Sequence, residues 1–379
     1  MQEVSIGLIA APELPEKIAN DIVNELPRIF SSQIDDINWK IEIEINPLTG
    51  AAETQQEISD EAHNIMVRKN WDYTLCLTDL PLFSQKQIVL ADVNYQLKIA
   101  RISLPAFGFT PVRYRVKKAM IEIIGDLYYQ GLKKEQYNVE KEGKSDVDKK
   151  TGDHVKKYFR FSPIRRIISP DGMNESNVRY IVIPKINGRL RLLLGMTHAN
   201  RPWTIVSSFK PIIAVAFATG AYVLIFPTLW KLSVSFSVYR LIGLMSVAVV
   251  SMVIWMVVSH HLWEKQSEKS KKKLRRLYNY ATITTLTIAV CSYYVMLFII
   301  FLVAIMFFVP PDLFSSTTNI EGTVDLTTFV KLAWLATSVA TIAGSIGASV
   351  ENEELVRNVA YGYRQNRRYR EMKQTESRK

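Results

Sequence analysis

The sequence predicts a cytoplasmic α/β domain with a mixed, mostly parallel sheet, followed by an all-α domain of four transmembrane helices. Residues 1–200 mix charged and apolar residues evenly, and their hydrophobic periodicity alternates between strand and helix. Residues 205–350 are mostly apolar, with their charges gathered in one loop. A spanning helix needs roughly 20 apolar residues to cross the bilayer. Four stretches meet this length, at about 206–229, 239–259, 281–309 and 327–350.

Residues 1–132 carry the pattern of the α/β domain. Strands are expected at EVSIGLIA, INWKIEIEI, DYTLCLTD, QIVLADVN and LKIARISL, and helices over 14–30, 54–70 and 111–130. The resulting order βαβαβββα is typical of an α/β layer fold. Residues 133–160 are charged and poor in large apolar side chains, which predicts a loop or linker. In the membrane-proximal segment 161–204, two apolar runs flank Asn187-Gly188, which predicts a β-hairpin.

The distribution of charge predicts the topology. Basic loops stay in the cytoplasm, and here the 260–280 loop and the 351–379 tail are basic whereas the 310–326 loop is acidic. We therefore expect a multi-pass protein of the plasma membrane with both termini cytoplasmic. The net charge of +11 then indicates an anionic inner leaflet as partner and disfavours nucleic acid, because the basic clusters adjoin the spans. The residues expected to contact this leaflet are Lys271, Lys272, Lys273, Arg275, Arg276, Arg367, Arg368 and Arg370.

The fourth span contains a strip of small residues that recur every four positions: Ala336, Ala340, Gly344 and Ala348. Small residues at this spacing let helix backbones approach closely. Two interpretations stay open, packing within the bundle and packing against a second protomer in a homo-oligomer. The cores of the spans hold no Asp, Glu, Lys or His, which disfavours proton-coupled transport but leaves a pore formed by oligomerisation open.

Ligands of α/β sheets gather at the carboxyl ends of the strands. Those ends offer residues 10–13, Thr78-Asp79, residues 92–94 and Ser103, without a P-loop or a GxGxxG sequence. Asp79 and Asp92 are either strand-end turn residues or a pair that meets across neighbouring strands and binds a cation. We therefore assign no catalytic residue, metal ligand or cofactor.

The segments LTDLPLF and ARISLPAFG ahead of a helix are similar to small zincin-like peptidases. Those enzymes hold zinc with two His one helical turn apart and use a Glu beside the first. In the corresponding helix of this chain, Glu122 is present but both His are missing. The resemblance implies a degenerate peptidase domain that still binds peptide.

A second resemblance rests on LLLGMTHANRPW, LWE and LYNYAT, in roughly the C-terminal half. This pattern resembles an uncharacterised family of bacterial polytopic membrane proteins with a GMxxANRPW-like segment before the first span. The resemblance supports the architecture and implies no activity. The sequence thus favours a non-enzymatic membrane protein that senses, regulates or scaffolds through an unidentified protein partner. An oligomeric channel or transporter subunit and a membrane-bound hydrolase are the alternatives.

Overall fold

The computed structural model describes a chain made of two compact units. The described residues are 3–52, 55–84, 87–109, 112–139, 164–168, 177–183, 185–206, 209–264, 272–319, 324–347 and 356–376. The first unit comprises Met1–Ala199 together with Gln365–Lys379, and the second comprises Asn200–Arg364. The first unit is therefore built from two segments far apart in the sequence. The division predicted from the sequence differs. It ends the part before the membrane helices at residue 204 and treats the 351–379 tail as separate, whereas the structure assigns Gln365–Lys379 to the first unit.

The first unit is organised around one mixed sheet. Its strands are β1 (Glu3–Ala10), β2 (Asn38–Ile45), β3 (Tyr73–Thr78), β4 (Leu82–Ser84), β5 (Gln87–Asn94), β6 (Ile99–Ser103), β7 (Ile164–Ile168) and β8 (Asn177–Val182). The order is β2-β1-β3-β6-β5-β8-β7, with β4 paired to β5. β1 pairs in parallel with β2 and β3, and β3 with β6, whereas all pairs of β5 and the β7–β8 pair are antiparallel. The α/β character and the mixed sheet are confirmed, but the expectation of a mostly parallel sheet is wrong, because four of the seven strand pairs among the described residues are antiparallel.

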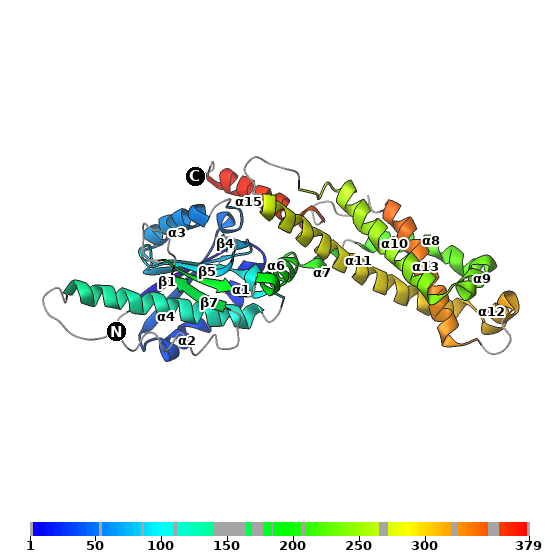
Figure 1. The fold of residues 1–379 in the computed structure, drawn as a ribbon, viewed down its shortest axis with the longest axis horizontal. Helices are drawn as coiled ribbons and strands as arrows, with labels where there is room; N and C mark the ends of the chain where they lie inside the picture. Colours follow the sequence, from blue (N-terminus) through cyan, green and yellow to red (C-terminus); the bar gives the residue numbers. More distant parts are fainter. Residues whose placement is uncertain are drawn as a thin grey trace. The chain divides into compact units, whose positions relative to one another are not determined.

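Helices cover both faces of this sheet (Figure 1). They are α1 (Leu14–Ile22), α2 (Leu26–Gln33), α3 (Gln55–Lys69), α4 (Val112–Val139) and α6 (Lys185–Ala199), with 3-10 turns η1 (Pro47–Gly50) and η2 (Leu104–Phe107). α3 lies on one face, and α4 with α2 on the other. The single helix expected over 14–30 is wrong, because the chain breaks at residues 23–25 and α2 restarts with Pro27 in its first turn. Proline lacks the N–H that a continuous helix needs and clashes with the preceding turn.

The hairpin expected at Asn187-Gly188 is also wrong. These residues lie within α6, which packs against η2. A Cβ at Gly195 would overlap the backbone of Pro105, so glycine permits the close approach of the helix to this turn. The run LRLLL at 190–194 consists of good helix formers, and this propensity together with packing overrides the two-residue turn signal. The antiparallel pair that does form in this region is β7–β8.

The second unit is helical, with α7 (Pro202–Val206), α8 (Lys210–Ile225), α9 (Pro227–Ser235), α10 (Val238–Ser259), α11 (Lys272–Phe308), α12 (Pro311–Thr318) and α13 (Leu326–Gly347). Three helices, in α10, α11 and α13, are long and apolar enough to cross a membrane. α8 and α9 meet at 87° and add a fourth span only if the bent pair counts as one. The continuous span expected over 206–229 therefore does not form, because Pro227 starts a new helix after the chain turns at Phe226.

The small-residue strip on α13 faces the interior of the second unit. Its described members are all buried: Ala336, Ala340 and Gly344. A Cβ at Gly344 would lie 3.2 Å from Tyr293 Oη of α11 and 3.3 Å from Ala216 Cβ of α8. Ala348 lies outside the described residues. These contacts favour packing within the bundle over packing against a second protomer.

Candidate functional site

The carboxyl ends of β1 and β3 form the position at which α/β proteins bind ligands. β1 lies between β2 and β3, so the chain connections diverge on either side of it, and we call the space that their loops enclose at this edge the crevice. Three loops line the crevice, namely residues 11–13 after β1, η1 after β2 and residues 79–80 after β3. Backbone bonds join them, from Ala11 N to Leu77 O (2.9 Å) and from Asn46 N to Ala10 O (3.0 Å).

The crevice is occupied by Arg368 of α15 (Tyr361–Glu376), the C-terminal helix. Arg368 Nη1 and Nη2 donate to Asp79 Oδ1 (2.8 Å) and Oδ2 (3.1 Å) in a bidentate pair. Nη1 also donates to the backbone oxygen of Gly50 and Nη2 to that of Pro12, each at 3.1 Å. Glu13 Oε2 lies 3.7 Å from Arg368 Nη2. The side chain of Arg368 is 1% exposed and that of Asp79 is 2% exposed. Charge-assisted bidentate pairs of this kind are among the stronger hydrogen bonds in proteins.

The acceptors of the crevice are held in place by bonds that do not involve α15. Thr78 Oγ1 donates to Thr49 O (2.6 Å) and accepts from Leu80 N (3.0 Å). Ser103 Oγ donates to Leu80 O (2.8 Å), which ties the β3 loop to the end of β6. Gly50 adds space, because a Cβ there would overlap Arg368 Nη1. The acceptors all come from residues 1–199, and they hold the flat guanidinium of Arg368.

Glu13 at the edge of the crevice has a strained backbone. Its φ of 74° lies in a region that side chains other than glycine rarely adopt. Its backbone N–H donates to Glu16 Oε2 (3.3 Å) in a capping box at the start of α1, and its Oε1 accepts from Arg367 Nη2 (2.9 Å). Such strain costs about 1–3 kcal/mol and clusters at ligand sites and switch regions. This outlier lies at the same edge of the sheet as the pairing of Arg368 with Asp79.

The expected lipid contact does not hold for Arg368, because its guanidinium is enclosed by protein acceptors. Arg367 is partly buried and ion-paired to Glu13 and Glu371, whereas Arg370 is exposed. In the other basic cluster, Arg275 is half-buried and Arg276 is exposed, and the side chains of Lys271, Lys272 and Lys273 lie outside the described residues. Leaflet contact stays a prediction for the exposed members.

Asp79 and Asp92 do not meet, so the alternative that they form a cation-binding pair is wrong. Asp92 lies within β5 and pairs with Arg101 of β6 and with Arg179 of β8, whose Nε donates to Asp92 Oδ1 at 3.0 Å. β6 separates β3 from β5, and β5 runs antiparallel to β6, so its carboxyl end lies at the opposite edge. Asp92 is thus compensated by two arginines in the sheet, away from the crevice.

Glu122 of the zincin-like segment lies on α4 beside a buried polar cluster. One turn later, Asp126 accepts hydrogen bonds from Tyr95 Oη (2.6 Å), Tyr180 Oη (3.3 Å) and Arg166 Nη2 (3.0 Å). Burial raises the pKa of Glu122 to about 8, with Lys118 opposing. Among the described residues, no group of three or more His, Cys, Asp or Glu side chains is arranged to hold a metal ion.

A polar cluster in the second unit joins the segments ANRPW, LWE and LYNYAT, each from a different part of the sequence. Asn200 Nδ2 donates to Thr285 Oγ1 (2.9 Å), and Asn200 Oδ1 accepts from Arg364 Nη2 (2.9 Å). Glu264 N donates to Asn279 Oδ1 (3.0 Å). These bonds give a structural reason for Asn200 and Asn279 within the segments ANRPW and LYNYAT.

The same cluster holds the first turn of α15. Glu264 Oε1 accepts from Gly362 N (2.6 Å), one of the free amides at the start of this helix. Burial raises the pKa of Glu264, although this hydrogen bond lowers it. The Tyr361 ring stacks on Tyr278 with centroids 5.0 Å apart, and the Arg364 guanidinium lies 4.4 Å from the Tyr361 ring centre. α15 thus has side chains engaged in each unit, with Arg364 and Arg368 one helical turn apart.

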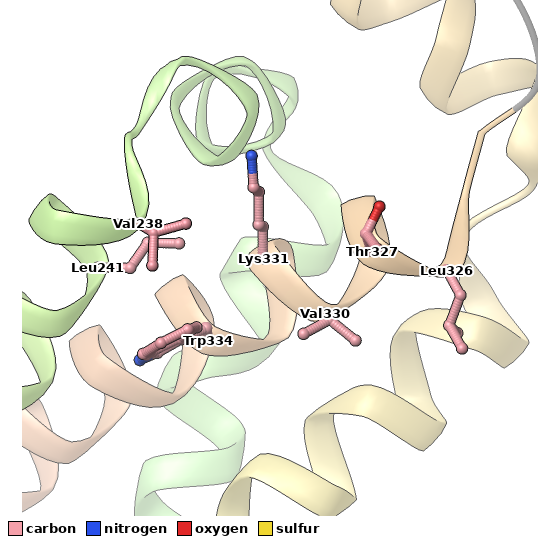
Figure 2. Close-up of a pocket in the computed structure, with 7 residues that line it drawn as sticks. All are labelled: Val238, Leu241, Leu326, Thr327, Val330, Lys331 and Trp334. Atoms are coloured by element: carbon pink, nitrogen blue, oxygen red, sulfur yellow. The ribbon is translucent and has the colours of Figure 1, made fainter.

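A separate hollow of about 360 Å³ lies between α10 and α13 (Figure 2). Its lining residues are Val238 and Leu241 of α10 with Leu326, Thr327, Val330, Lys331 and Trp334 of α13. Figure 2 shows Lys331 extending away from the axis of α13, and it is the one charged group of this lining. An apolar hollow on helices of this kind fits hydrocarbon and lacks the convergent polar groups of the crevice.

The chain was also compared with known proteins. No protein-family model matches it, and neither a curated protein nor a solved structure matches it.

Proposed function

We propose that this chain is a membrane-anchored regulatory protein in which the C-terminal helix occupies the ligand crevice of the α/β unit. The pairing of Arg368 with Asp79 carries this proposal, because a charged side chain from the chain's own tail fills the position where α/β proteins bind ligands. A tail that competes with a ligand for one crevice reports whether that ligand is bound. The function is then sensing or regulation through a partner and not catalysis.

The membrane arrangement is part of the proposal. Three long apolar helices support membrane association, and the basic 260–280 loop and tail support cytoplasmic termini. An impermeant thiol reagent on intact cells tests this, with Ser316→Cys and Arg370→Cys introduced separately into a chain lacking Cys76 and Cys291. Both positions are exposed in the structure. The cysteine at 316 is expected to react and the one at 370 is not; labelling at 370 would contradict the orientation.

Release of Arg368 is the event that would change the protein's partners. The test is co-purification from native membranes with proteins identified by mass spectrometry, comparing Arg368→Ala with Arg370→Ala. Arg370 is the matched control, because it lies on the same helix and is exposed. We expect Arg368→Ala to change the recovered partners and Arg370→Ala to leave them as in the wild type. The same partners in all three samples would refute the regulatory role.

A further inference from the structure

We infer that the crevice around Asp79 is a binding site for a guanidinium compound, and that Arg368 is its internal occupant. The inference rests on the proposed function and names the ligand class of the same crevice. It predicts that a small molecule carrying a guanidinium group binds where the Arg368 guanidinium now lies.

The acceptors match this group by number and direction. Asp79 presents both carboxylate oxygens, and the carbonyl oxygens of Gly50 and Pro12 complete a set of four acceptors around two terminal nitrogens. A guanidinium is planar, permanently charged and purely a donor, and its fork meets a carboxylate with two parallel bonds. An ammonium has three donors on one nitrogen and cannot reproduce the two-nitrogen pattern.

The crevice needs a cation whenever α15 is not in place. Asp79 is 2% exposed, and its surroundings are fixed by the Thr78 and Ser103 bonds, which do not depend on Arg368. Removing one partner of a buried ion pair lowers the compensation of the charge that remains, and this destabilises the native state. A guanidinium compound that enters the vacated crevice recovers much of the lost stability, so the site favours binding over collapse.

Arg368 is a displaceable occupant. Its Nε is buried and has no hydrogen-bond partner among the described residues, so one of its donors is unsatisfied in the crevice. The neighbouring positions on α15, Tyr369 and Arg370, are exposed. An external guanidinium compound offers the same four terminal N–H donors to these acceptors. The bonds of Arg368 therefore hold it in the crevice, and its unsatisfied donor lowers the cost of displacing it by a ligand.

The test is binding of methylguanidinium to the purified full-length Arg368→Ala protein in detergent, followed by its melting temperature. We expect a saturable rise of the melting temperature, because a ligand that binds the native state stabilises it. Methylammonium, which has the same charge without the fork, is expected to give a smaller rise. The wild type is expected to respond less than Arg368→Ala, and Asp79→Asn combined with Arg368→Ala is expected not to respond.

Three results would overturn the inference. They are equal responses to methylguanidinium and methylammonium, a response that persists when Asp79 is replaced by Asn, and no saturable response at all. A larger response to magnesium or calcium would assign the crevice to a metal ion instead. If Arg368→Ala yields no folded protein, Arg368→Gln keeps a polar side chain, is shorter and uncharged, and allows the same titration. The partner comparison between Arg368→Ala and Arg370→Ala reads the proposed function separately, so the two failures are distinguishable.

Discussion

At the scale of single residues, the chain combines a buried ion pair with a strained residue at one edge of its sheet. The pairing of Arg368 with Asp79 spans 289 positions of the sequence, and Glu13 beside it has a φ of 74°. Buried ion pairs add little net stability compared with apolar side chains of the same size, because both charges lose their water. Their presence together with strain is more consistent with a switching or ligand role than with a stabilising one.

The sequence could predict one half of this site. Asp79 follows a strand that reads clearly from its apolar residues, so its place at the carboxyl edge follows from elementary α/β topology. Arg368 lies in a basic tail in which all arginines have similar sequence neighbours. The sequence therefore does not distinguish an arginine that binds in the crevice from one that contacts lipid. A pairing between polar residues far apart in the sequence produces no periodic pattern in the sequence. The role of Arg368 could therefore be seen only in the structure.

The carboxyl of Glu122 should make stability depend on pH. Burial raises its pKa from 4.5 to about 8, so the native state holds a proton that the unfolded chain releases above pH 4.5. Stability should therefore fall as pH rises between these two values and then level off. Glu122→Gln is expected to flatten this decline, with the largest gain in melting temperature near pH 8. The charged neighbours are Lys118 and Asp126, which oppose each other.

The control for this measurement is Glu3→Gln, because Glu3 is an exposed carboxylate at the start of β1. Its pH profile of melting temperature is expected to parallel that of the wild type. A Glu122→Gln profile that also parallels the wild type would show that the Glu122 carboxyl titrates in its ordinary range.

At the scale of elements, the long apolar helices and the strands of the α/β unit follow from periodicity, and the errors concern breaks and turns. α10 and α13 begin within one residue of the expected positions, at Val238 and Leu326. Two segments predicted as single helices are divided, near Pro27 and at Pro227. The prediction failed because the apolar pattern continues across each proline. The Asn187-Gly188 turn signal failed for a related reason, since tertiary packing of α6 on η2 outweighs local preference.

The strip on α13 gives a prediction at this scale. Gly344→Leu should overpack the contact with Tyr293 and Ala216, which lie 3.2 and 3.3 Å from a Cβ at this position, and cost about 1–3 kcal/mol. Gly243→Leu in α10 is the matched control, because a Cβ there meets no atom within 4 Å. We expect a lower melting temperature in detergent for Gly344→Leu alone. An unchanged melting temperature with an altered elution volume would instead assign the strip to a protomer interface.

At the scale of the whole molecule, the main finding is that the α/β unit is discontinuous in sequence. Sequence patterns divide a chain into consecutive domains, and a polar helix after the last span reads as a tail. The structure returns residues from Gln365 onward to the first unit, whereas Arg364 and the residues before it belong to the second. The boundary between the two units therefore falls within α15, a helix that sequence patterns assign to neither.

Division of the chain tests this organisation. Residues 1–199 expressed alone lack Arg368, so this fragment should be less stable than the same fragment with a synthetic peptide of residues 361–379. The peptide should raise the melting temperature with increasing concentration, since it binds the native state. A peptide with Arg368→Ala should lose most of this effect, whereas one with Arg370→Ala should keep it, because Arg370 is exposed. The contrary result is a fragment whose melting temperature is the same with and without peptide and to which no peptide binds. The C-terminal helix would then not be a structural part of the α/β unit. If the Arg368→Ala peptide binds as tightly as the native one, the affinity comes from other residues of the helix. Arg367, which pairs with Glu13, is then the first residue to replace.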